Sequence, residues 1–139
     1  MGIVRSEIFL RNSDDVAFAH GGFIPKEKIR EMNLFALVDS GAEMLCLPEA
    51  VALQLGLKKL GETTAQLADG QVISVNLVGP VDLHILNRIN VVMGMVLPNS
   101  NEVLLGAIPL QGMDLMIDLK NESLVLPPDR PYLAQVLLK

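Results

Sequence analysis

Apolar residues fall mostly in short runs or alternate with polar residues along the chain, which is the pattern of β-strands. From Ile73 to Leu77 every second residue is apolar, and the residues between are Ser and Asn. Gly, Pro, Asn and Asp interrupt the runs at short intervals, as they do in all-β domains. The pattern predicts strands over residues 3–11, 34–38, 43–47, 81–86, 89–97 and 103–105, a hairpin over 63–78, and a last hairpin from 115–118 and 123–126.

Helical signals are few and short. Pro48 suits the first position of a helix and Gly56 suits its C-terminal stop, so residues 48–55 are predicted to form about two turns. Residues 25–32 predict one or two further turns, beginning at Pro25, and residues 108–113 a brief helix. Residues 12–15, Asn-Ser-Asp-Asp, are interpreted as a turn.

The hairpin over residues 63–78 has Asp69-Gly70 at its centre. This dipeptide favours a two-residue type I′ turn between two strands. As a plain turn residue, Asp69 needs no further role.

An acidic residue ends one of the most apolar strands. Residues 35–38 are Phe-Ala-Leu-Val, and Asp39-Ser40-Gly41-Ala42 follow directly. A carboxylate at the end of a core strand either caps the next turn or takes part in chemistry. The pattern alone leaves both possibilities open for Asp39.

The length of 139 residues fits a single domain, taken here as 1–139. Half of the residues are hydrophobic, but no apolar run approaches the ~18 residues of a membrane span. We therefore expect no membrane partner, and we expect the surplus apolar surface to form a protein–protein interface.

Charge and cysteine content exclude other classes. The net charge is −5 and there is no basic patch, so no nucleic-acid partner is expected. Cys46 is the single cysteine, flanked by leucines, and is interpreted as a buried, inert thiol. With no secretory leader expected in residues 1–15, these features favour the cytoplasm. His20 and His84 lack metal-ligand spacing, so neither metal nor cofactor is predicted.

Two segments of the sequence share a weak internal similarity. Residues 37–55 and 101–115 each contain an apolar strand, Gly-Ala, a proline and an apolar segment. The second copy has Leu105 where the first has Ser40, and it lacks the acid.

These features together resemble the retropepsin-like aspartic proteases, in particular their small single-domain bacterial members. The resemblance covers roughly residues 33–126 and rests on three ordered motifs: Asp39-Ser40-Gly41-Ala42, the hairpin at Asp69-Gly70, and Leu104-Leu105-Gly106. It implies a mostly-β, single-lobe acid protease barrel with one or two short helices.

The resemblance also implies roles. Asp39 would be the catalytic acid, with Ser40, Gly41 and Ala42 supporting its loop. Ala68, Asp69 and Gly70 would form a flap over the substrate, and residues 104–106 would cross behind the acid loop. Because such catalysis needs two carboxylates and the chain has one motif, a homodimer acting on a peptide or protein is implied. One departure is Ala107, where viral members often have an arginine that ties the dimer together.

Two classes of function remain. The first is a homodimeric aspartic endopeptidase that cleaves extended peptides with a water activated by two Asp39 carboxylates. The second is a module of the same fold that binds a peptide or partner strand without cutting it. The intact acid motif favours the enzyme, since a binding module does not need the carboxylate.

Overall fold

The computed structural model describes residues 3–131. Its helices and strands follow one another in this order: β1 (Arg5–Asn12), α1 (Ser13–His20), the 3-10 helix η1 (Lys26–Lys28), β2 (Glu31–Val38), β3 (Leu45–Pro48), α2 (Glu49–Gln54), β4 (Lys58–Gln66), β5 (Val72–Ile85), β6 (Arg88–Leu97), β7 (Val103–Leu105), α3 (Ala107–Met113), β8 (Met116–Asp118) and β9 (Ser123–Val125).

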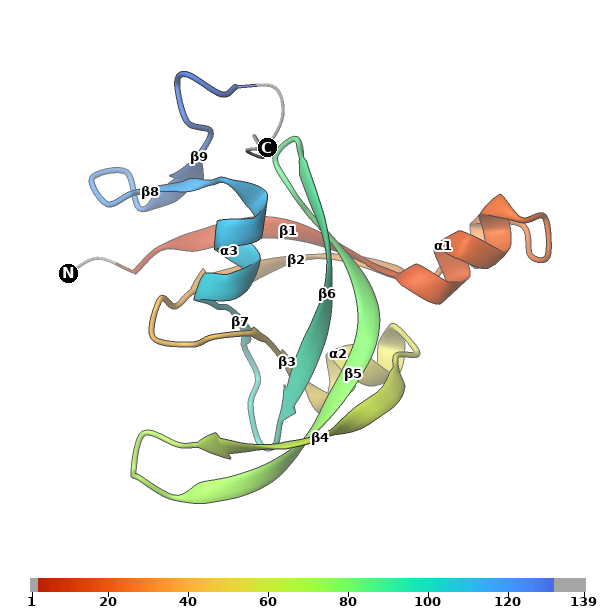
Figure 1. The fold of residues 1–139 in the computed structure, drawn as a ribbon, viewed down its shortest axis with the longest axis horizontal. Helices are drawn as coiled ribbons and strands as arrows, with labels where there is room; N and C mark the ends of the chain where they lie inside the picture. The colour runs from red at the N-terminus through yellow and green to blue at the C-terminus, as the bar shows by residue number, and fades with distance from the viewer. Residues whose placement is uncertain (1–2, 132–139) are drawn as a thin grey trace, which may run out of the picture.

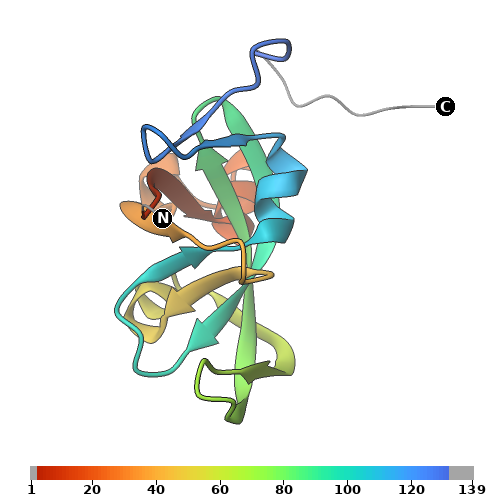
Figure 2. The same cartoon turned by 90° about the vertical axis from the view of Figure 1, so that its left-hand side faces the viewer.

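Six of these strands close into a barrel. The sheet order is β1-β2-β7-β3-β6-β5-β4, and β1 also pairs with β5, which completes the ring. β4 extends the sheet beyond the ring and forms a long hairpin with the first half of β5. This β4–β5 hairpin (residues 58–78) lies at one end of the molecule, and the β8–β9 hairpin lies at the other (Figures 1 and 2). The predicted mostly-β, single-lobe barrel with few short helices is confirmed.

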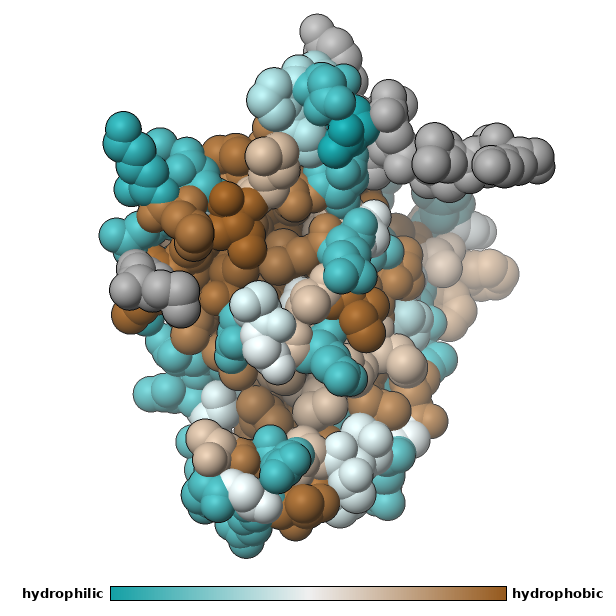
Figure 3. All heavy atoms as spheres, turned by 60° about the vertical axis from the view of Figure 1, so that its left-hand side comes forward, coloured by the Kyte–Doolittle hydropathy of each residue, from teal (hydrophilic) through white to brown (hydrophobic). Residues whose placement is uncertain are grey.

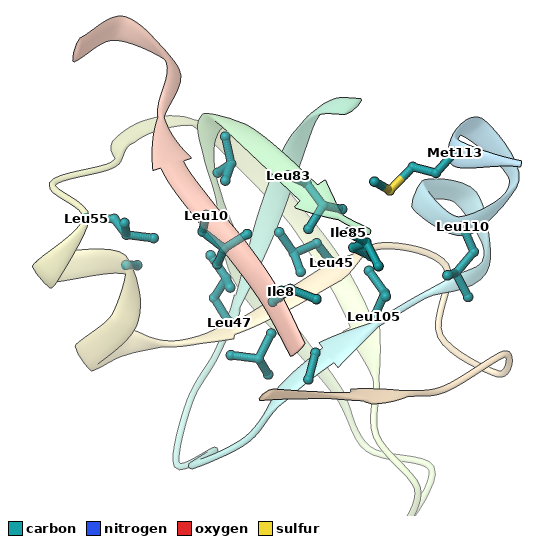
Figure 4. Packing of buried hydrophobic residues seen from close by; sticks show 14 of the residues in the cluster. Ile8, Leu10, Leu45, Leu47, Leu55, Leu83, Ile85, Leu105, Leu110 and Met113 are labelled. Atoms are coloured by element: carbon teal, nitrogen blue, oxygen red, sulfur yellow. The ribbon is translucent and has the colours of Figure 1, made fainter. Parts of the chain in front are cut away.

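Aliphatic side chains from alternate positions of the strands fill the barrel. The largest members of this core are fully buried leucines and isoleucines, joined from α3 by Met113 (Figure 4): Ile8, Leu10, Leu45, Leu47, Leu83, Ile85 and Leu105. Each such side chain contributes about 1.5–3 kcal/mol when it leaves water. An aliphatic core explains how the chain folds without tryptophan.

Residues 12–15 form the start of a helix, so the predicted turn is wrong. The Asn12 side chain accepts a hydrogen bond from the Asp15 N–H (3.1 Å), which makes Asn12 the N-cap of α1. Asp14 and Asp15 then lie in the first turn, where the helix dipole favours acids. Asn, Ser and Asp favour both turns and helix starts, so the sequence was ambiguous here.

A partly buried polar network links the start of α1 to the end of α2 and to Arg30. The Asn12 amide donates to the carbonyl oxygens of Leu55 and Gly56 at the end of α2 (2.9 and 3.2 Å). The Asp15 carboxylate accepts from the Arg30 backbone N–H and from Nε and Nη2 of its guanidinium, at 2.8–3.0 Å. The hydrogen bonds from the Arg30 side chain are the main reason why the pKa of Asp15 is lowered.

Two further boundaries differ from the prediction. Only residues 26–28 are helical in the segment 25–32, and β2 begins at Glu31, three residues before its predicted start. The strands predicted over 73–78 and 81–86 are one strand, β5, which continues through Gly79 and Pro80. The pairing of β5 with β6 shifts register between Val78 and Val81, so the expected break is only an irregularity.

The turn of the β4–β5 hairpin is also different. The Gly70 N–H donates to the Leu67 carbonyl oxygen (2.9 Å), and the Leu67 N–H donates to that of Gln71 (2.8 Å). A type I′ turn needs a positive φ at both central residues. Gly70 has φ +86°, but the φ of Asp69 is not positive, so the prediction of a type I′ turn is wrong. A three-residue loop that ends in a left-handed glycine connects the strands. The Asp69 carboxylate stabilises this loop by accepting from the Gln71 N–H (2.9 Å).

The remaining predicted elements are confirmed. α2 follows Pro48 and stops before Gly56, which has φ +62°. α3 occupies the predicted helix near residues 108–113, and β8 and β9 form the last hairpin. None of the helices in residues 3–131 combines the length and the apolar character that a transmembrane span requires.

Candidate active site

Asp39 lies where β2 leaves the barrel. Its N–H donates to the carbonyl oxygen of Leu105 on β7 (3.0 Å), which extends the pairing of β2 with β7 by one residue. Its own carbonyl oxygen accepts from the Ala42 N–H (3.1 Å) and closes a turn over residues 39–42. The backbone of the acid is therefore held by the barrel on one side and by its own turn on the other.

The Asp39 carboxylate has a single hydrogen-bond partner in the described part of the chain. Oδ1 accepts from the Gly41 N–H at 2.9 Å, and no basic side chain within residues 3–131 pairs with the group. The bond to Gly41 is the local contact that a capping role requires. It occupies one of the two oxygens, so the geometry is compatible with both roles considered for Asp39.

Gly41 leaves space beside the Asp39 carboxylate, and its backbone conformation does not itself favour glycine. Its φ is not left-handed, but a Cβ at this position would lie 3.2 Å from Asp39 Oδ1. A larger residue would therefore crowd the carboxylate. The tight turn expected of Gly41 forms without unusual dihedrals.

The three residues after β7 support the loop from behind. A Cβ on Gly106 would lie 2.5–2.7 Å from backbone atoms of Glu43 and Met44, so only glycine allows this approach. The Ala107 N–H donates to the Ala42 carbonyl oxygen (2.9 Å), and the Ile108 N–H donates to that of Glu43 (3.0 Å). The segment predicted to cross behind the acid loop thus fixes the loop by direct contacts.

β7 also connects the two sides of the loop. It pairs in parallel with β2 and antiparallel with β3, so Leu105 lies opposite both Val38 and Leu45. Leu105 is fully buried in the core, whereas Leu104 points to the other side of the sheet and lines a cleft.

This cleft has a volume of about 720 Å³ and contains Asp39 in its wall. The acid loop, the β4–β5 hairpin and the ends of β6 and β7 line it: Asp39, Gly41, Ala42, Glu43, Met44, Cys46, Thr64, Ala65, Gln66, Leu67, Ala68, Met95, Leu97 and Leu104. The volume is in the range of pockets that bind small-molecule ligands.

The predicted site residues are distributed unevenly around this cleft. Asp39, Gly41, Ala42 and Leu104 line it together with Ala68. Ser40 is exposed, and its hydroxyl makes no hydrogen bond with residues 3–131. Asp69 and Gly70 lie at the exposed tip of the hairpin, outside the lining. Leu105 and Gly106 are buried behind the loop, where they support it without reaching the cleft.

Sequence reasoning missed the apolar wall of the cleft. Met44 and Cys46 alternate with the core residues Leu45 and Leu47 on either side of β3. This alternation was readable directly after the acid motif, since successive side chains of a strand point to opposite faces. Cys46 is buried as predicted, yet it lines the cleft, and burial together with the charge of Asp39 raises the pKa of its thiol.

The comparison with protein families agrees with this geometry. The family described as gag-polyprotein putative aspartyl protease matches residues 27–114, which is more than half of the chain. The chain belongs to this family. The match contains the acid loop, the β4–β5 hairpin and the segment behind the loop, and it excludes β1, α1, β8 and β9. No curated protein matches the chain. The retropepsin-like relationship and the fold that it implies are thereby confirmed.

Proposed function

We propose that the protein is an aspartic endopeptidase that acts as a homodimer, with one Asp39 from each chain. The observation that carries this proposal is the position of Asp39 in the wall of a cleft of about 720 Å³ in a chain of an aspartyl protease family. Each chain has one acid motif, so a second copy would supply the second carboxylate. An extended peptide would lie between the two acid loops and the two β4–β5 hairpins.

The chemistry needs two carboxylates that share one proton. The ionised Asp39 accepts a proton from a water molecule, whose oxygen forms a bond to the scissile carbonyl carbon. The partner's Asp39, which is protonated, donates its proton to the carbonyl oxygen. The tetrahedral intermediate then collapses: Asp39, now protonated, donates its proton to the amide nitrogen as the C–N bond breaks, and the partner's ionised Asp39 takes the proton of one hydroxyl as the carbonyl re-forms. In each step one acid is the donor and the other the acceptor.

The surface beside the acid loop supports the dimer. Figure 3 views the molecule from the side on which α3, β8 and the acid loop lie in Figure 1, and apolar residues gather on this face. Exposed apolar side chains on the flanking segments belong to Ile3, Phe35, Ile108, Met116 and Ile117. The Ser40 hydroxyl is exposed and has no partner within the described chain, so it would be free to form a hydrogen bond with a second copy.

The cleft favours apolar side chains next to the scissile bond. The apolar part of its lining includes Met44, Cys46, Met95, Leu97 and Leu104. Unbranched, polarisable Met side chains adapt to ligands of different shape. The β4–β5 hairpin would act as the flap, because residues Thr64–Ala68 line the cleft on the side of this hairpin.

The test is digestion of a mixed peptide library by the purified protein between about pH 4 and pH 7, with products identified by mass spectrometry. We expect cleavage between apolar residues, and no cleavage by Asp39→Asn prepared in parallel. Products that form equally with Asp39→Asn would contradict the proposal. If the wild-type protein binds peptides but does not cut them, the result would favour the non-catalytic binding module.

A further inference from the structure

We propose that Arg88 is a positioning residue for the acid loop, because it fixes one end of α3 and the other end of α3 holds the loop. The inference rests on the proposed peptidase function, since this loop carries Asp39. Arg88 is 2% exposed and is the one Lys or Arg that is buried among residues 3–131. A buried cation is costly unless its charge and its N–H groups are compensated. Arg88 does not line the cleft, so its burial has another explanation.

The Arg88 guanidinium binds the end of α3. Nε donates to the carbonyl oxygen of Met113, the last residue of α3, at 3.0 Å. Nη2 donates to the Arg130 carbonyl oxygen at 2.5 Å, and Nη1 donates to Asn87 Oδ1 at 2.9 Å. Carbonyl groups at the C-terminal end of a helix lack helical partners and carry partial negative charge, which favours a cation there. Arg88 therefore ties both α3 and the segment at Arg130 to the start of β6.

Two further contacts fix the same end of α3. Nε and Nη2 of Arg130 donate to the two carboxylate oxygens of Asp114, the C-cap of α3, at 2.6 and 3.1 Å. Because Arg88 binds the Arg130 carbonyl oxygen, it also holds the residue that binds this C-cap. A Cβ on Gly112 would lie 2.6 Å from Asn90 Nδ2, so α3 packs closely against β6 there. The start of β6 is thus the base for the C-terminal end of α3.

α3 needs such external support. It has seven residues, which include Pro109 and Gly112, and no side chain caps its N-terminus. The Leu110 N–H donates to the Gly106 carbonyl oxygen at 3.5 Å, which is long for a helical hydrogen bond. A helix this short is not stable alone, and an internal glycine weakens it further. The position of α3 is therefore set by the residues that it contacts.

The N-terminal end of α3 passes this position to the acid loop. The N–H groups of Ala107 and Ile108 donate to the carbonyl oxygens of Ala42 and Glu43, at 2.9 and 3.0 Å. These carbonyl groups directly follow the turn that begins at Asp39. A displacement of α3 at Arg88 would therefore move the loop and its carboxylate, whereas the strand residues that line the cleft would stay in place. We expect Arg88 to affect the rate of the chemical step more than substrate binding.

The test measures kcat and KM for one peptide that the wild-type protein cleaves. In Arg88→Met we expect kcat to fall about tenfold or more, since small misplacements of catalytic groups have effects of this size. KM should change by less than about twofold, because the cleft lining is retained. Arg88→Lys keeps the charge but not the planar fork that reaches several oxygen atoms, so its kcat should fall by a smaller factor.

Leu55→Ala is the matched control for a loss of stability alone. Leu55 is fully buried and lies at the opposite side of the core from Met113 (Figure 4). At a temperature where both variants are folded, Leu55→Ala should keep the wild-type kcat. If Leu55→Ala and Arg88→Met lose kcat equally at equal loss of thermal stability, the positioning role is overturned.

Amide hydrogen exchange, followed by NMR, tests the same inference without catalysis. In Arg88→Met the protection of the Ala107 and Ile108 N–H groups should fall about tenfold relative to the protected amides of β5, whereas Leu55→Ala should keep this ratio. If the wild-type protein cuts no peptide but the ratio still falls, the proposed peptidase function fails and the role of Arg88 in holding the loop stands. Wild-type kcat together with an unchanged ratio in Arg88→Met would overturn the inference. If Arg88→Met does not fold, the same result in Arg88→Lys would overturn it.

Discussion

Gly106 contacts Met44 so closely that a Cβ on Gly106 would lie 2.5 Å from the Met44 carbonyl oxygen. The obstacle is backbone, which cannot move aside as the end of a side chain can. We expect Gly106→Ala to push the acid loop away from α3, to lower the stability by about 2–3 kcal/mol and to abolish most cleavage. Thermal unfolding and peptide cleavage measure the two effects. Gly61→Ala is the control, because a Cβ there meets nothing within 4 Å. Equal unfolding temperatures for both variants would contradict the contact.

Asp39→Asn should remove cleavage and leave the dimer intact. Asn can neither accept the proton of the water nor donate one to the carbonyl oxygen. At pH 7 the two Asp39 carboxylates of the proposed dimer repel each other, and two Asn residues do not. Sedimentation at several concentrations should therefore give an equal or lower dissociation constant for the variant.

The control for this variant is Asp129→Asn, which alters a largely exposed acid near the end of the described chain. It should cleave peptides at the wild-type rate. A dimer of Asp39→Asn that is much weaker than wild type at pH 7 would instead support the capping role of Asp39 through its bond to Gly41.

Asp15 should make the fold less stable in acid. The pKa of Asp15 is lowered in the folded protein, chiefly by the Arg30 side chain, so its contribution is present above the unfolded value near 3.8. The contribution is lost as the pH falls through the lower, folded value. Asp15→Asn should cost about 1–2 kcal/mol at pH 7, measured by urea unfolding, and the difference from wild type should narrow below about pH 4.

Asp14→Asn provides the comparison for Asp15, since Asp14 makes only a surface ion pair with Lys58. It should change the stability by less than about 0.5 kcal/mol at either pH. A difference between wild type and Asp15→Asn that stays constant from pH 7 to pH 3 would show that the carboxylate charge is not what Arg30 stabilises.

The tip of the β4–β5 hairpin should matter more for cleavage than for stability. Gly70 has φ +86°, which a β-branched residue strongly resists, yet a Cβ at Gly70 meets nothing within 4 Å. We expect Gly70→Val to distort the loop and lower kcat/KM about tenfold, with a loss of stability near 1 kcal/mol. Gly70→Asn should be intermediate, since Asn tolerates the left-handed region better than Val. Identical kcat/KM for the Val variant and wild type would remove the flap role.

Most of the barrel could be predicted from sequence because its strands alternate regularly and its turns contain Gly, Pro, Asn or Asp. The predicted elements were wrong where the same local sequence pattern is typical of two different structures. Asn12-Ser13-Asp14-Asp15 was interpreted as a turn, but the same side chains start a helix once Asn12 can also bond to the end of α2. Gly79-Pro80 suggested a strand end, but β6 pairs with β5 both before and after it, and β1 pairs with β5 directly after it.

The site was only partly predictable. Asp39 and its loop follow from a local motif, and residues 104–106 from a second one. The alternation after the acid motif shows that Met44 and Cys46 share one face, but not that this face borders a cleft, because residues such as Met95 and Cys46 have the same signature in a core and in a cleft. Which face they share depends on the pairing of β3 with β6, a long-range contact that alternation alone does not determine.

The position of β7 between β2 and β3 has a consequence for the order of events during synthesis. The N–H of Asp39 bonds to Leu105, and the loop that follows bonds to residues 107 and 108, more than sixty residues downstream. A nascent chain that has released residues 1–100 from the ribosome contains the acid but not the backbone that orients it. Closing so long a loop is among the slower steps of β-barrel folding. The acid loop can therefore reach its final geometry only after residue 108 has emerged, so the proposed proteolytic activity would begin only when the barrel is nearly complete.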